Sequence, residues 1–299
     1  MRRGYLPILL TVAGIWGASF MFIEIGLDDL APTTLMAGRC LVAMLFLLSL
    51  MAFTRTLGKL REAGVRTFAL GIINSALPFT LIAWGQQHID SGVAAIGNAS
   101  VPIWVAVLAI WLAHSERATG LRIVGIVLGI VGVAVLTGAQ PETDRWAVAG
   151  TLAVILASIL YALASLLLQR LTGRLDPVTL STGTMIGATA ALLPFGIAQA
   201  PGELPGWEAA GAVLALGLAG TGAGILIFMK IISDHGSFRA GLVTYLLPVT
   251  ALLYGVFLLG EEVTRWMLAG LALILSGVAL GSGILRPSPA AEAPQPARS

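Results

Sequence analysis

Long apolar runs separated by short polar segments repeat along the whole chain of 299 residues. Residues 91–113, for example, contain no Lys, Arg, Asp or Glu, and a helix of that length extends about 34 Å, enough to cross a bilayer. Glycine, proline and charged clusters divide the chain into ten such segments. The predicted membrane-spanning helices are 6–27, 31–53, 65–86, 91–113, 119–138, 147–169, 176–199, 208–231, 237–259 and 264–285.

Composition supports an integral membrane protein. The chain is 57% hydrophobic and only 11% charged, whereas soluble domains average about 45–50% and 25%. The apolar runs also lack the alternation of apolar and polar residues that membrane β-strands show. We therefore expect an all-α polytopic membrane protein surrounded by membrane lipids, with connections too short for a soluble domain. The Pro/Ala-rich residues 287–299 are expected to form a disordered cytoplasmic tail.

Basic residues in the loops predict the orientation. With the N-terminus inside the cell, thirteen Lys and Arg residues fall on the cytoplasmic side and two, Arg145 and Arg265, on the other. Because cytoplasmic loops carry an excess of Lys and Arg, both termini are predicted to be cytoplasmic, in the inner (plasma) membrane. The basic residues are thus interpreted as a sign of orientation, and no nucleic-acid partner is expected.

The chain contains two related halves, predicted as residues 1–143 and 144–286. Each holds five helices, and because five is odd, the halves must enter the membrane from opposite sides, as in many secondary transporters. The apolar start could pass for a signal peptide, but it has a counterpart in the second half and is predicted to be the first helix. At an offset of 145 or 146, the corresponding residues include Trp16 and Tyr161, Pro32 and Pro177, Gly38 and Gly183, Gly71 and Gly217, Ser91 and Ser237, and Pro102 and Pro248.

Pro102 and Pro248 lie about a dozen residues along the fourth and ninth predicted helices. Proline removes a backbone donor and costs roughly 3 kcal/mol inside a helix. In a membrane it is tolerated where neighbours or water satisfy the freed carbonyl, commonly beside a cavity. For either proline alone, a kink that only improves packing is the alternative. Their duplicated placement favours two helices that open their backbone to a central cavity near the midplane.

The motif GIWGASF lies at 14–20, within the first predicted helix. Two pairs of motifs mark the ends of corresponding helices: AHSE at 113–116 with LLGEE at 258–262, and GIVGVAVLTG at 129–138 with LILSGVALGSG at 273–283. With these motifs the chain resembles the drug/metabolite transporter (DMT) superfamily, specifically the EamA-type ten-helix exporters, and its overall pattern is similar to the YddG-type amino-acid exporters. The resemblance covers residues 5–285 and implies transport of a small molecule by alternating access, through a central cavity between the repeats. AHSE departs from the LGE typical of the family.

The superfamily carries amino acids, amines, nucleotide sugars and sugar phosphates, so the substrate must be read from the helices. A phosphate-bearing substrate needs several cations, and apart from the basic residues counted above on the two sides of the membrane, only Arg39 and Lys230 lie within the predicted helices. The other candidates are aromatic or amide side chains, which suit neutral or aromatic amino acids. The aromatic residues could instead form an interfacial belt, and the amides could bond a neighbouring helix. The candidate substrate-binding residues are Trp16, Asn74, Asn98, Pro102, Trp104, Tyr161, Tyr245 and Pro248.

Glu24 and Arg39 are the ionisable residues within the first predicted helix hairpin. Charges inside a membrane usually pair or face water, so we predict an ion pair or a shared aqueous vestibule. The pair could be a clamp without a role in transport, or a gate. Export of cationic drugs is the alternative function, and Glu24 is the one carboxylate available to such a cation.

Other features are predicted to be structural. Gly125, Gly129 and Gly132 recur at helical spacing and are expected to allow close helix packing, as are Gly71 and Ser75. The single cysteine, Cys40, is expected to be a buried thiol.

An intramembrane enzyme and a channel are the two other function classes that an apolar chain of this kind could represent. No HExxH motif and no paired aspartates occur within the helices, and the three histidines fall at helix ends. This disfavours an intramembrane enzyme, and no metal or cofactor is expected. A channel is the second alternative, but inverted repeats favour a moving carrier. The sequence predicts no oligomeric state.

Overall fold

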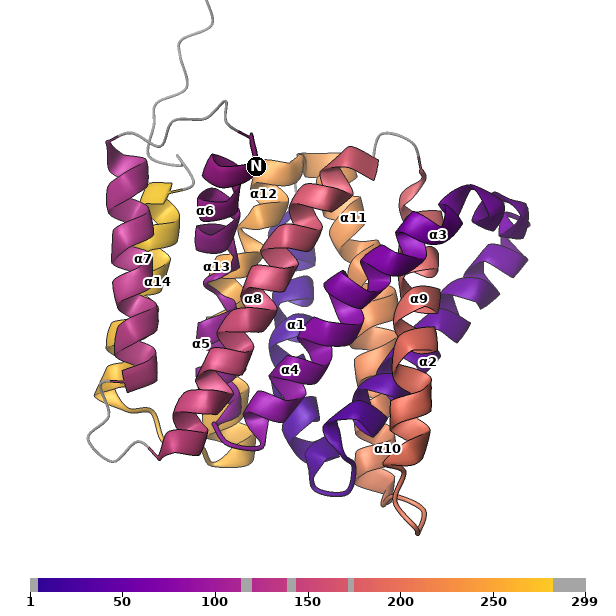
Figure 1. Cartoon of the computed structure of the whole chain (residues 1–299), viewed down its shortest axis with the longest axis horizontal. Helices are drawn as coiled ribbons and strands as arrows, with labels where there is room; N and C mark the ends of the chain where they lie inside the picture. Colours follow the sequence, from indigo (N-terminus) through magenta and orange to yellow (C-terminus); the bar gives the residue numbers. More distant parts are fainter. Residues whose placement is uncertain (1–4, 114–119, 139–143, 172–174, 282–299) are drawn as a thin grey trace, which may run out of the picture.

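The computed structural model describes residues 5–113, 120–138, 144–171 and 175–281 of the chain. Throughout these ranges every regular element is a helix (Figure 1), which confirms the all-α prediction. Glu116 and the predicted tail at 287–299 lie outside the described residues. We call the end of the bundle where Tyr5 lies the N-terminal face, and the opposite end, where Leu27 lies, the far face (Figure 1).

The first half of the chain crosses the bundle repeatedly between these two faces (Figure 1). Two of its five predicted helices are interrupted, one by a π-helical segment and one by a short break. Its elements are α1 (Tyr5–Leu27), α2 (Pro32–Phe53), the short 3₁₀ helix η1 (Leu57–Lys59), α3 (Leu60–Gly71), the π-helical η2 (Ile72–Ala76), α4 (Leu77–Gln86), α5 (Ser91–Asn98), α6 (Val101–Ala113) and α7 (Leu121–Gly138).

The second half repeats this order in the opposite direction. α1 begins at the N-terminal face, whereas its counterpart α8 begins at the far face (Figure 1), so the repeats are inverted. The elements are α8 (Arg145–Leu171), α9 (Pro177–Ala198), α10 (Trp207–Leu214), the π-helical η3 (Ala215–Ala223), α11 (Gly224–His235), α12 (Ser237–Gly241), α13 (Val243–Tyr254), the π-helical η4 (Gly255–Leu259) and α14 (Arg265–Gly281).

Eight helical segments of the described chain are long and apolar enough to cross a membrane. Two shorter apolar helices, Ile123–Thr137 and Arg265–Gly281, coincide with the fifth and tenth predicted helices. The chain is therefore a multi-pass membrane protein. The total of ten crossings and the cytoplasmic position of the termini stay predictions.

The break between α5 and α6 explains Pro102. α5 ends at Asn98 and α6 begins at Val101, so Pro102 occupies the second position of a new helix rather than the interior of one helix. In the first turn a backbone N–H has no intrahelical partner, and proline sacrifices no bond there. Pro248, by contrast, lies inside α13. The two prolines thus correspond in sequence but not in local structure.

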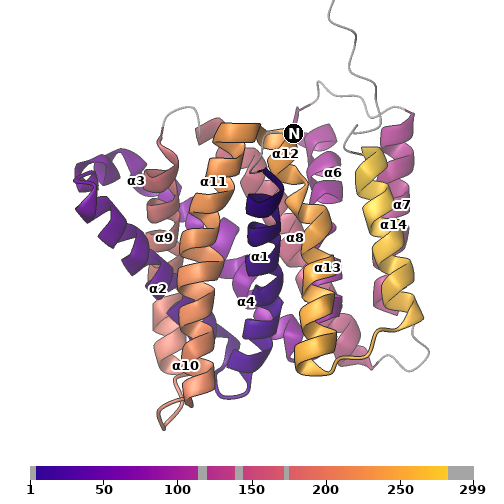
Figure 2. The same cartoon turned by 180° about the vertical axis from the view of Figure 1, so that it is seen from behind.

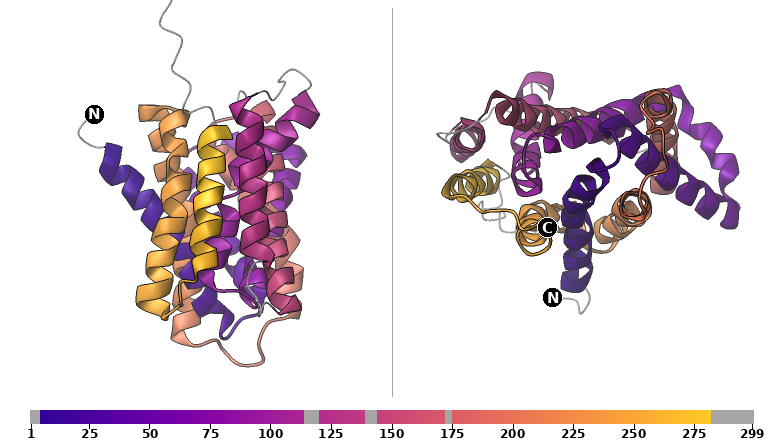
Figure 3. Two further views of the ribbon diagram at one scale, coloured as in Figure 1. Left: turned by 90° about the vertical axis from the view of Figure 1, so that its left-hand side faces the viewer. Right: turned by 90° about the horizontal axis from the view of Figure 1, so that it is seen from below.

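Glycines determine how closely several helices approach. α7 and α14 pack against each other at one edge of the bundle (Figure 3, left). A Cβ atom at Gly125 would lie only 2.6 Å from the carbonyl oxygen of Gly277, so this interface requires bare backbone. Gly71 meets the backbone of Thr184 in the same way where α3 crosses α9. The close-packing prediction for these two glycines is confirmed.

The core lies between the repeats. α1 lies between α11 and α13 (Figure 2), and it packs against both. Thr250 of α13 donates its hydroxyl to the carbonyl oxygen of Ala13 in α1 at 2.8 Å. Cys40 is fully buried within the main hydrophobic cluster, which confirms the prediction of a buried thiol.

Candidate functional site

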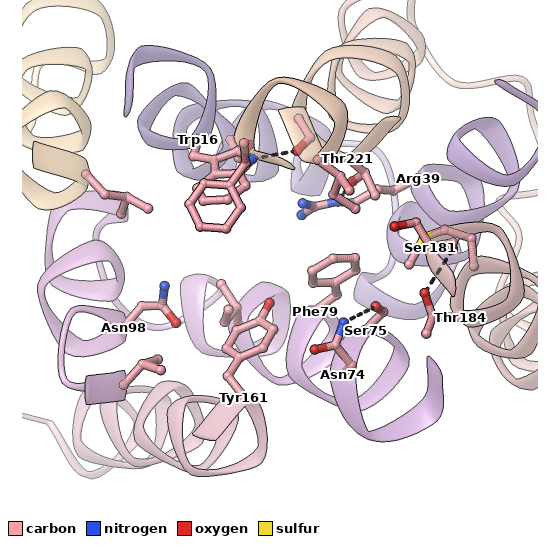
Figure 4. A pocket seen from close by; sticks show the side chains of 18 of the residues that line it. Trp16, Arg39, Asn74, Ser75, Phe79, Asn98, Tyr161, Ser181, Thr184 and Thr221 are labelled. Carbon is pink, nitrogen blue, oxygen red and sulfur yellow. Dashed lines mark hydrogen bonds between the residues drawn. The ribbon is translucent and has the colours of Figure 1, made fainter. Parts of the chain in front are cut away.

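A cavity of about 400 Å³ lies between the two repeats. Its walls come from α1, α2, η2, α4, α5 and α6 of the first half and from α8, α9, η3, α11 and α13 of the second. No described residue of α7 or α14 lines it. Figure 4 shows side chains that line this cavity, and Figure 3 (right) shows the arrangement of the helices from below. A cavity of this size falls within the range of small-molecule sites, roughly 300–1,000 Å³.

Many of the lining residues form pairs related by the offset of 145 or 146 positions between the halves. The pairs are Trp16–Tyr161, Ile23–Leu168, Arg39–Thr184, Asn74–Gly220, Ser75–Thr221, Phe79–Ile225, Ile82–Phe228, Asn98–Thr244 and Val101–Leu247. The cavity therefore lies on the pseudo-two-fold axis of the fold, where inverted-repeat transporters have their sites. The chemistry within the pairs is unequal. The first half supplies Arg39, Asn74 and Asn98 at positions where the second half has threonine or glycine.

Two π-helical segments line the cavity at corresponding positions. η2 covers residues 72–76, and its counterpart falls within η3 at 215–223. π-Helical turns widen the backbone and occur frequently at functional sites. In η3 the hydroxyl of Thr221 donates to the carbonyl oxygen of Leu216 at 3.0 Å. The indole Nε1–H of Trp16 donates to the carbonyl oxygen of Gly220, also at 3.0 Å. Side chains thus satisfy carbonyl groups in a segment whose hydrogen-bond ladder is irregular.

Arg39 is the charged residue of the described lining. Its side chain is buried, with 7% of the residue exposed. Nε donates to Thr221 Oγ1 at 2.9 Å across the two repeats, and the guanidinium carbon lies 3.8 Å from the ring centroid of Phe79. Both contacts fix the plane of the guanidinium group. Its tip points into the open space (Figure 4).

Aromatic side chains form much of the remaining wall. The Trp16 and Phe228 rings lie 5.0 Å apart, centroid to centroid, and the Phe79 and Tyr161 rings lie 6.4 Å apart in an edge-on arrangement. The two pairs come from both halves of the chain, and Trp16 and Tyr161 lie on opposite sides of the space (Figure 4). Such walls suit a substrate with an apolar or aromatic portion.

Asn98 presents an unused acceptor at the other side of the cavity from Arg39 (Figure 4). It ends α5, next to the break before α6. Its Oδ1 atom is buried and accepts no hydrogen bond from any residue that the structure describes. Because an unpaired buried polar atom is unfavourable, this oxygen is suited to accept a hydrogen bond from a bound molecule. Asn74 differs, since its amide donates to Ser75 Oγ at 3.3 Å.

Half of the predicted substrate-binding residues do not reach this cavity. Trp16, Asn74, Asn98 and Tyr161 line it, and Pro102, Trp104, Tyr245 and Pro248 are not among the lining residues. The reasons are local. The Trp104 indole donates to Ser100 Oγ at 3.0 Å, in the break just before its own helix, and Tyr245 packs against the cluster around Ile96. Pro248 is buried within α13, which instead presents Thr244 and Leu247 to the cavity.

Glu24 and Arg39 do not form the ion pair that their positions suggested. Among the described residues, Glu24 accepts a hydrogen bond from Gln86 Nε2 at 3.2 Å, and no carboxylate lies within ion-pair distance of Arg39. Gln86 also donates to the carbonyl oxygen of Phe20 at 2.9 Å, so Glu24 belongs to a contact between α1 and α4. Arg39 lines the cavity and Glu24 does not. A gating role for either residue stays a prediction.

Sequence reasoning missed several lining residues, above all Phe79, Ser181, Thr184, Thr221 and Phe228. Hydroxyl and phenyl side chains in apolar helices give no individual signal, because packing accounts for most of them. The offset between the repeats could have found some of them. Thr184 and Thr221 correspond to Arg39 and Ser75, and Phe228 corresponds to Ile82.

Comparison with known proteins supplies the family. The model of the EamA-like transporter family matches residues 3–138 and again residues 148–283, one match for each half of the bundle. The chain belongs to the EamA-like transporter family. It is therefore a transporter of the drug/metabolite type rather than an enzyme, which confirms the resemblance drawn from the motifs.

Full-length relatives carry transporter names. An uncharacterized transporter of Archaeoglobus fulgidus is 28% identical over 282 residues, covering 92% of this chain and 97% of the relative. The uncharacterized inner membrane transporter YedA of Escherichia coli (strain K12) is 26% identical, with 93% and 91% covered. A probable terminal-alkyne amino-acid exporter of Streptantibioticus cattleyicolor is 28% identical, with 94% and 93% covered.

A solved structure shares the fold. A protein crystal structure superposes with a TM-score of 0.68 and 19% sequence identity, covering 96% of this chain and 99% of the other. At this level of identity the likeness concerns the arrangement of the helices alone.

Proposed function

We propose that this EamA-family transporter exports neutral or aromatic amino acids across the inner (plasma) membrane, by alternating access through the cavity between its repeats. The observation that carries the proposal is the lining of that cavity, with aromatic walls from both repeats and one buried arginine. A zwitterion bears no net charge and needs few charged partners. An aromatic or aliphatic side chain finds apolar surface on Trp16, Phe79 and Tyr161.

Two relationships outside the cavity support the same function. The relative of Streptantibioticus cattleyicolor is named a probable amino-acid exporter, and YedA is named an inner membrane transporter. The inverted repeats supply two symmetry-related halves that can rock about a central site, which is the basis of alternating access. α7 and α14 contribute no described lining residue. The motion would therefore involve the other eight of the ten predicted membrane-spanning helices.

The charge of the cavity argues against cationic drugs. A bound organic cation requires a facing carboxylate or an aromatic cage free of competing positive charge. Glu24 hydrogen-bonds to Gln86 and is not a lining residue, whereas Arg39 is. Nucleotide sugars are disfavoured for a different reason, since their phosphates call for more cations than Arg39 alone.

A substrate panel tests the proposal. Purified protein in proteoliposomes is assayed for saturable uptake of labelled phenylalanine, leucine, a quaternary ammonium dye and a nucleotide sugar, with protein-free liposomes as the control. We expect saturable flux of the two amino acids, and reduced flux in the Asn98→Ala variant. Saturable flux of the dye or the nucleotide sugar, without any amino-acid flux, would contradict the substrate class and leave the fold untouched.

A further inference from the structure

The guanidinium group of Arg39 has donors to spare. One of its five N–H groups, Nε–H, is used by Thr221 Oγ1, and one face of the group is covered by Phe79. No further hydrogen-bond partner for Arg39 exists among the described residues, and its tip points into the cavity (Figure 4). A guanidinium held in this way presents its remaining edge as a planar fork, which matches the two oxygens of a carboxylate.

The cavity gives Arg39 no counter-ion. None of the described lining residues is Asp or Glu, and the ion pairs of the described chain are Lys59–Asp176 and Lys230–Asp234. A buried cation without a partner is unfavourable, and a bound anion relieves that cost. The symmetry-related position in the second repeat is occupied by Thr184, which carries no charge.

We propose that Arg39 binds the carboxylate of the transported molecule, so that the cavity selects monocarboxylates with an apolar or aromatic side chain and requires no amino group. This inference rests on the transport function proposed above and specifies its substrate class. One arginine matches one carboxylate, and no described lining residue of the second repeat is a cation that could bind the other carboxylate of a dicarboxylate. The aromatic walls receive the side chain.

The amino group of a bound amino acid would be held less strongly in the cavity than its carboxylate. Within the described lining an ammonium group finds no carboxylate, only neutral acceptors such as the unpartnered Oδ1 of Asn98. A hydrogen bond to a neutral amide contributes less than a charge-assisted pair. Removal of the amine should therefore change affinity little, whereas removal of the carboxylate should abolish binding.

Three ligands of matched shape separate these contributions. Binding of phenylalanine, 3-phenylpropionate and phenethylamine to the purified full-length protein is measured by isothermal titration calorimetry in detergent at pH 7. We expect phenylalanine and 3-phenylpropionate to bind with affinities within about tenfold of each other, and phenethylamine not to bind. The proposal would be overturned if phenethylamine binds as well as phenylalanine does. It would also be overturned if phenylalanine binds and 3-phenylpropionate does not. This series needs no variant and is independent of folding effects.

Variants test the residue itself. Arg39→Gln should weaken the binding of phenylalanine and of 3-phenylpropionate by roughly ten- to a hundredfold, because a charge-assisted hydrogen bond is lost. Arg39→Lys keeps the charge without the fork and should lose less. Arg66→Gln, the same change at an exposed arginine that does not line the cavity, is the matched control and should remain within about twofold of wild type. Equal affinity in wild type and folded Arg39→Gln would refute the role of Arg39.

The two proposals can fail separately. Amino-acid flux in proteoliposomes without binding of 3-phenylpropionate would keep the proposed function and discard carboxylate selection. Carboxylate binding through Arg39 without amino-acid flux would keep carboxylate selection and discard the proposed function.

Discussion

The carboxylate of Glu261 binds the start of α5 through Ser91. Its Oε1 accepts the backbone N–H of Ser91 at 2.8 Å, and its Oε2 accepts that of Gly92 at 3.0 Å. Glu261 follows η4 in the second repeat, whereas α5 belongs to the first, so one side chain caps a helix of the opposite repeat. A carboxylate at a helix N-terminus satisfies unpaired donors and complements the helix dipole. This contact joins the repeats at the far face.

Removal of that carboxylate should loosen α5. In Glu261→Ala we expect the backbone amides of Ser91 and Gly92 to lose their acceptors, at a cost of roughly 0.5–2 kcal/mol. Hydrogen–deuterium exchange of a peptide covering residues 88–98 should accelerate. Glu262→Ala is the control, because Glu262 is exposed and makes no hydrogen bond to a described residue. Unchanged exchange in Glu261→Ala, or equal acceleration in both variants, would contradict the cap.

A pH-dependent contact joins the repeats at the N-terminal face. Asp176 caps α9, accepting the N–H groups of Val178 and Thr179 at 3.1 Å each, and lies 3.8 Å from Lys59 Nζ. Partial burial raises the pKa of the Asp176 carboxyl, but the Thr179 hydrogen bonds and the charge of Lys59 outweigh it, so the pKa is lowered overall.

A lowered folded-state pKa means that the stabilisation by Asp176 is complete above the unfolded value of about 3.9. It is lost as the pH falls through the folded value below that. We expect Asp176→Asn, which retains a capping oxygen, to lower Tm at pH 7 by a small amount, since both side chains of the pair are partly exposed to solvent. The difference in Tm between wild type and Asp176→Asn should close as the pH falls below about 4. A gap that widens on acidification would contradict this account.

The symmetry-related aromatic residues Trp16 and Tyr161 should respond differently to the same kind of change. Trp16→Phe removes the hydrogen bond to Gly220 in η3, and we expect a loss of roughly 1–3 kcal/mol. Tyr161→Phe removes a hydroxyl that bonds to no described residue, so its effect on stability should be much smaller. Thermal unfolding of the two purified variants makes the comparison. A larger loss in Tyr161→Phe would show that the Trp16 contact is unimportant.

Orientation is the most direct consequence of the charge pattern. In a Cys40→Ala background, Pro201→Cys should react with a membrane-impermeant maleimide in intact cells, and Lys59→Cys should react only after permeabilisation. Both residues are exposed. Lys59 lies in the connection between α2 and α3 and Pro201 in the connection between α9 and α10, and these two connections are at opposite ends of the bundle (Figure 1). Cys40→Ala alone, which should stay unlabelled, is the control. Labelling at position 59 but not 201 in intact cells would reverse the predicted topology.

The fold was largely readable from the sequence because apolar run length determines helices in a membrane. All ten predicted segments coincide with helices or chains of helices. The interruptions were not readable. η2 and η3 arise where side chains such as Thr221 and Trp16 satisfy carbonyls of distant segments, and no periodicity within a single helix encodes those contacts. At Pro102 the sequence predicted a helix that opens its backbone to the cavity, with a kink as the alternative, and not a break between two helices.

The candidate site was predicted in part. Trp16 and Tyr161 were found because they correspond between the repeats, and Asn74 and Asn98 because amides are rare in apolar helices. Of the two arrangements predicted for Glu24 and Arg39, an ion pair or a shared vestibule, the ion pair is not formed. Glu24 is closer in sequence, yet the guanidinium meets Thr221, which lies 182 positions away. Helix register across an interface between repeats decides such a contact, and it cannot be read from spacing along one hairpin.

Counterflow in proteoliposomes tests the central claim, that amino acids pass through the cavity between the repeats. Vesicles loaded with unlabelled phenylalanine are supplied with labelled phenylalanine, using protein that carries Asn98→Cys in the Cys40→Ala background. We predict transient accumulation of label that a bulky thiol reagent abolishes, with protection by excess phenylalanine during the reaction, and no inhibition in Cys40→Ala alone. Accumulation that persists after complete alkylation of position 98, or no accumulation of any amino acid in the Cys40→Ala protein, would contradict the claim.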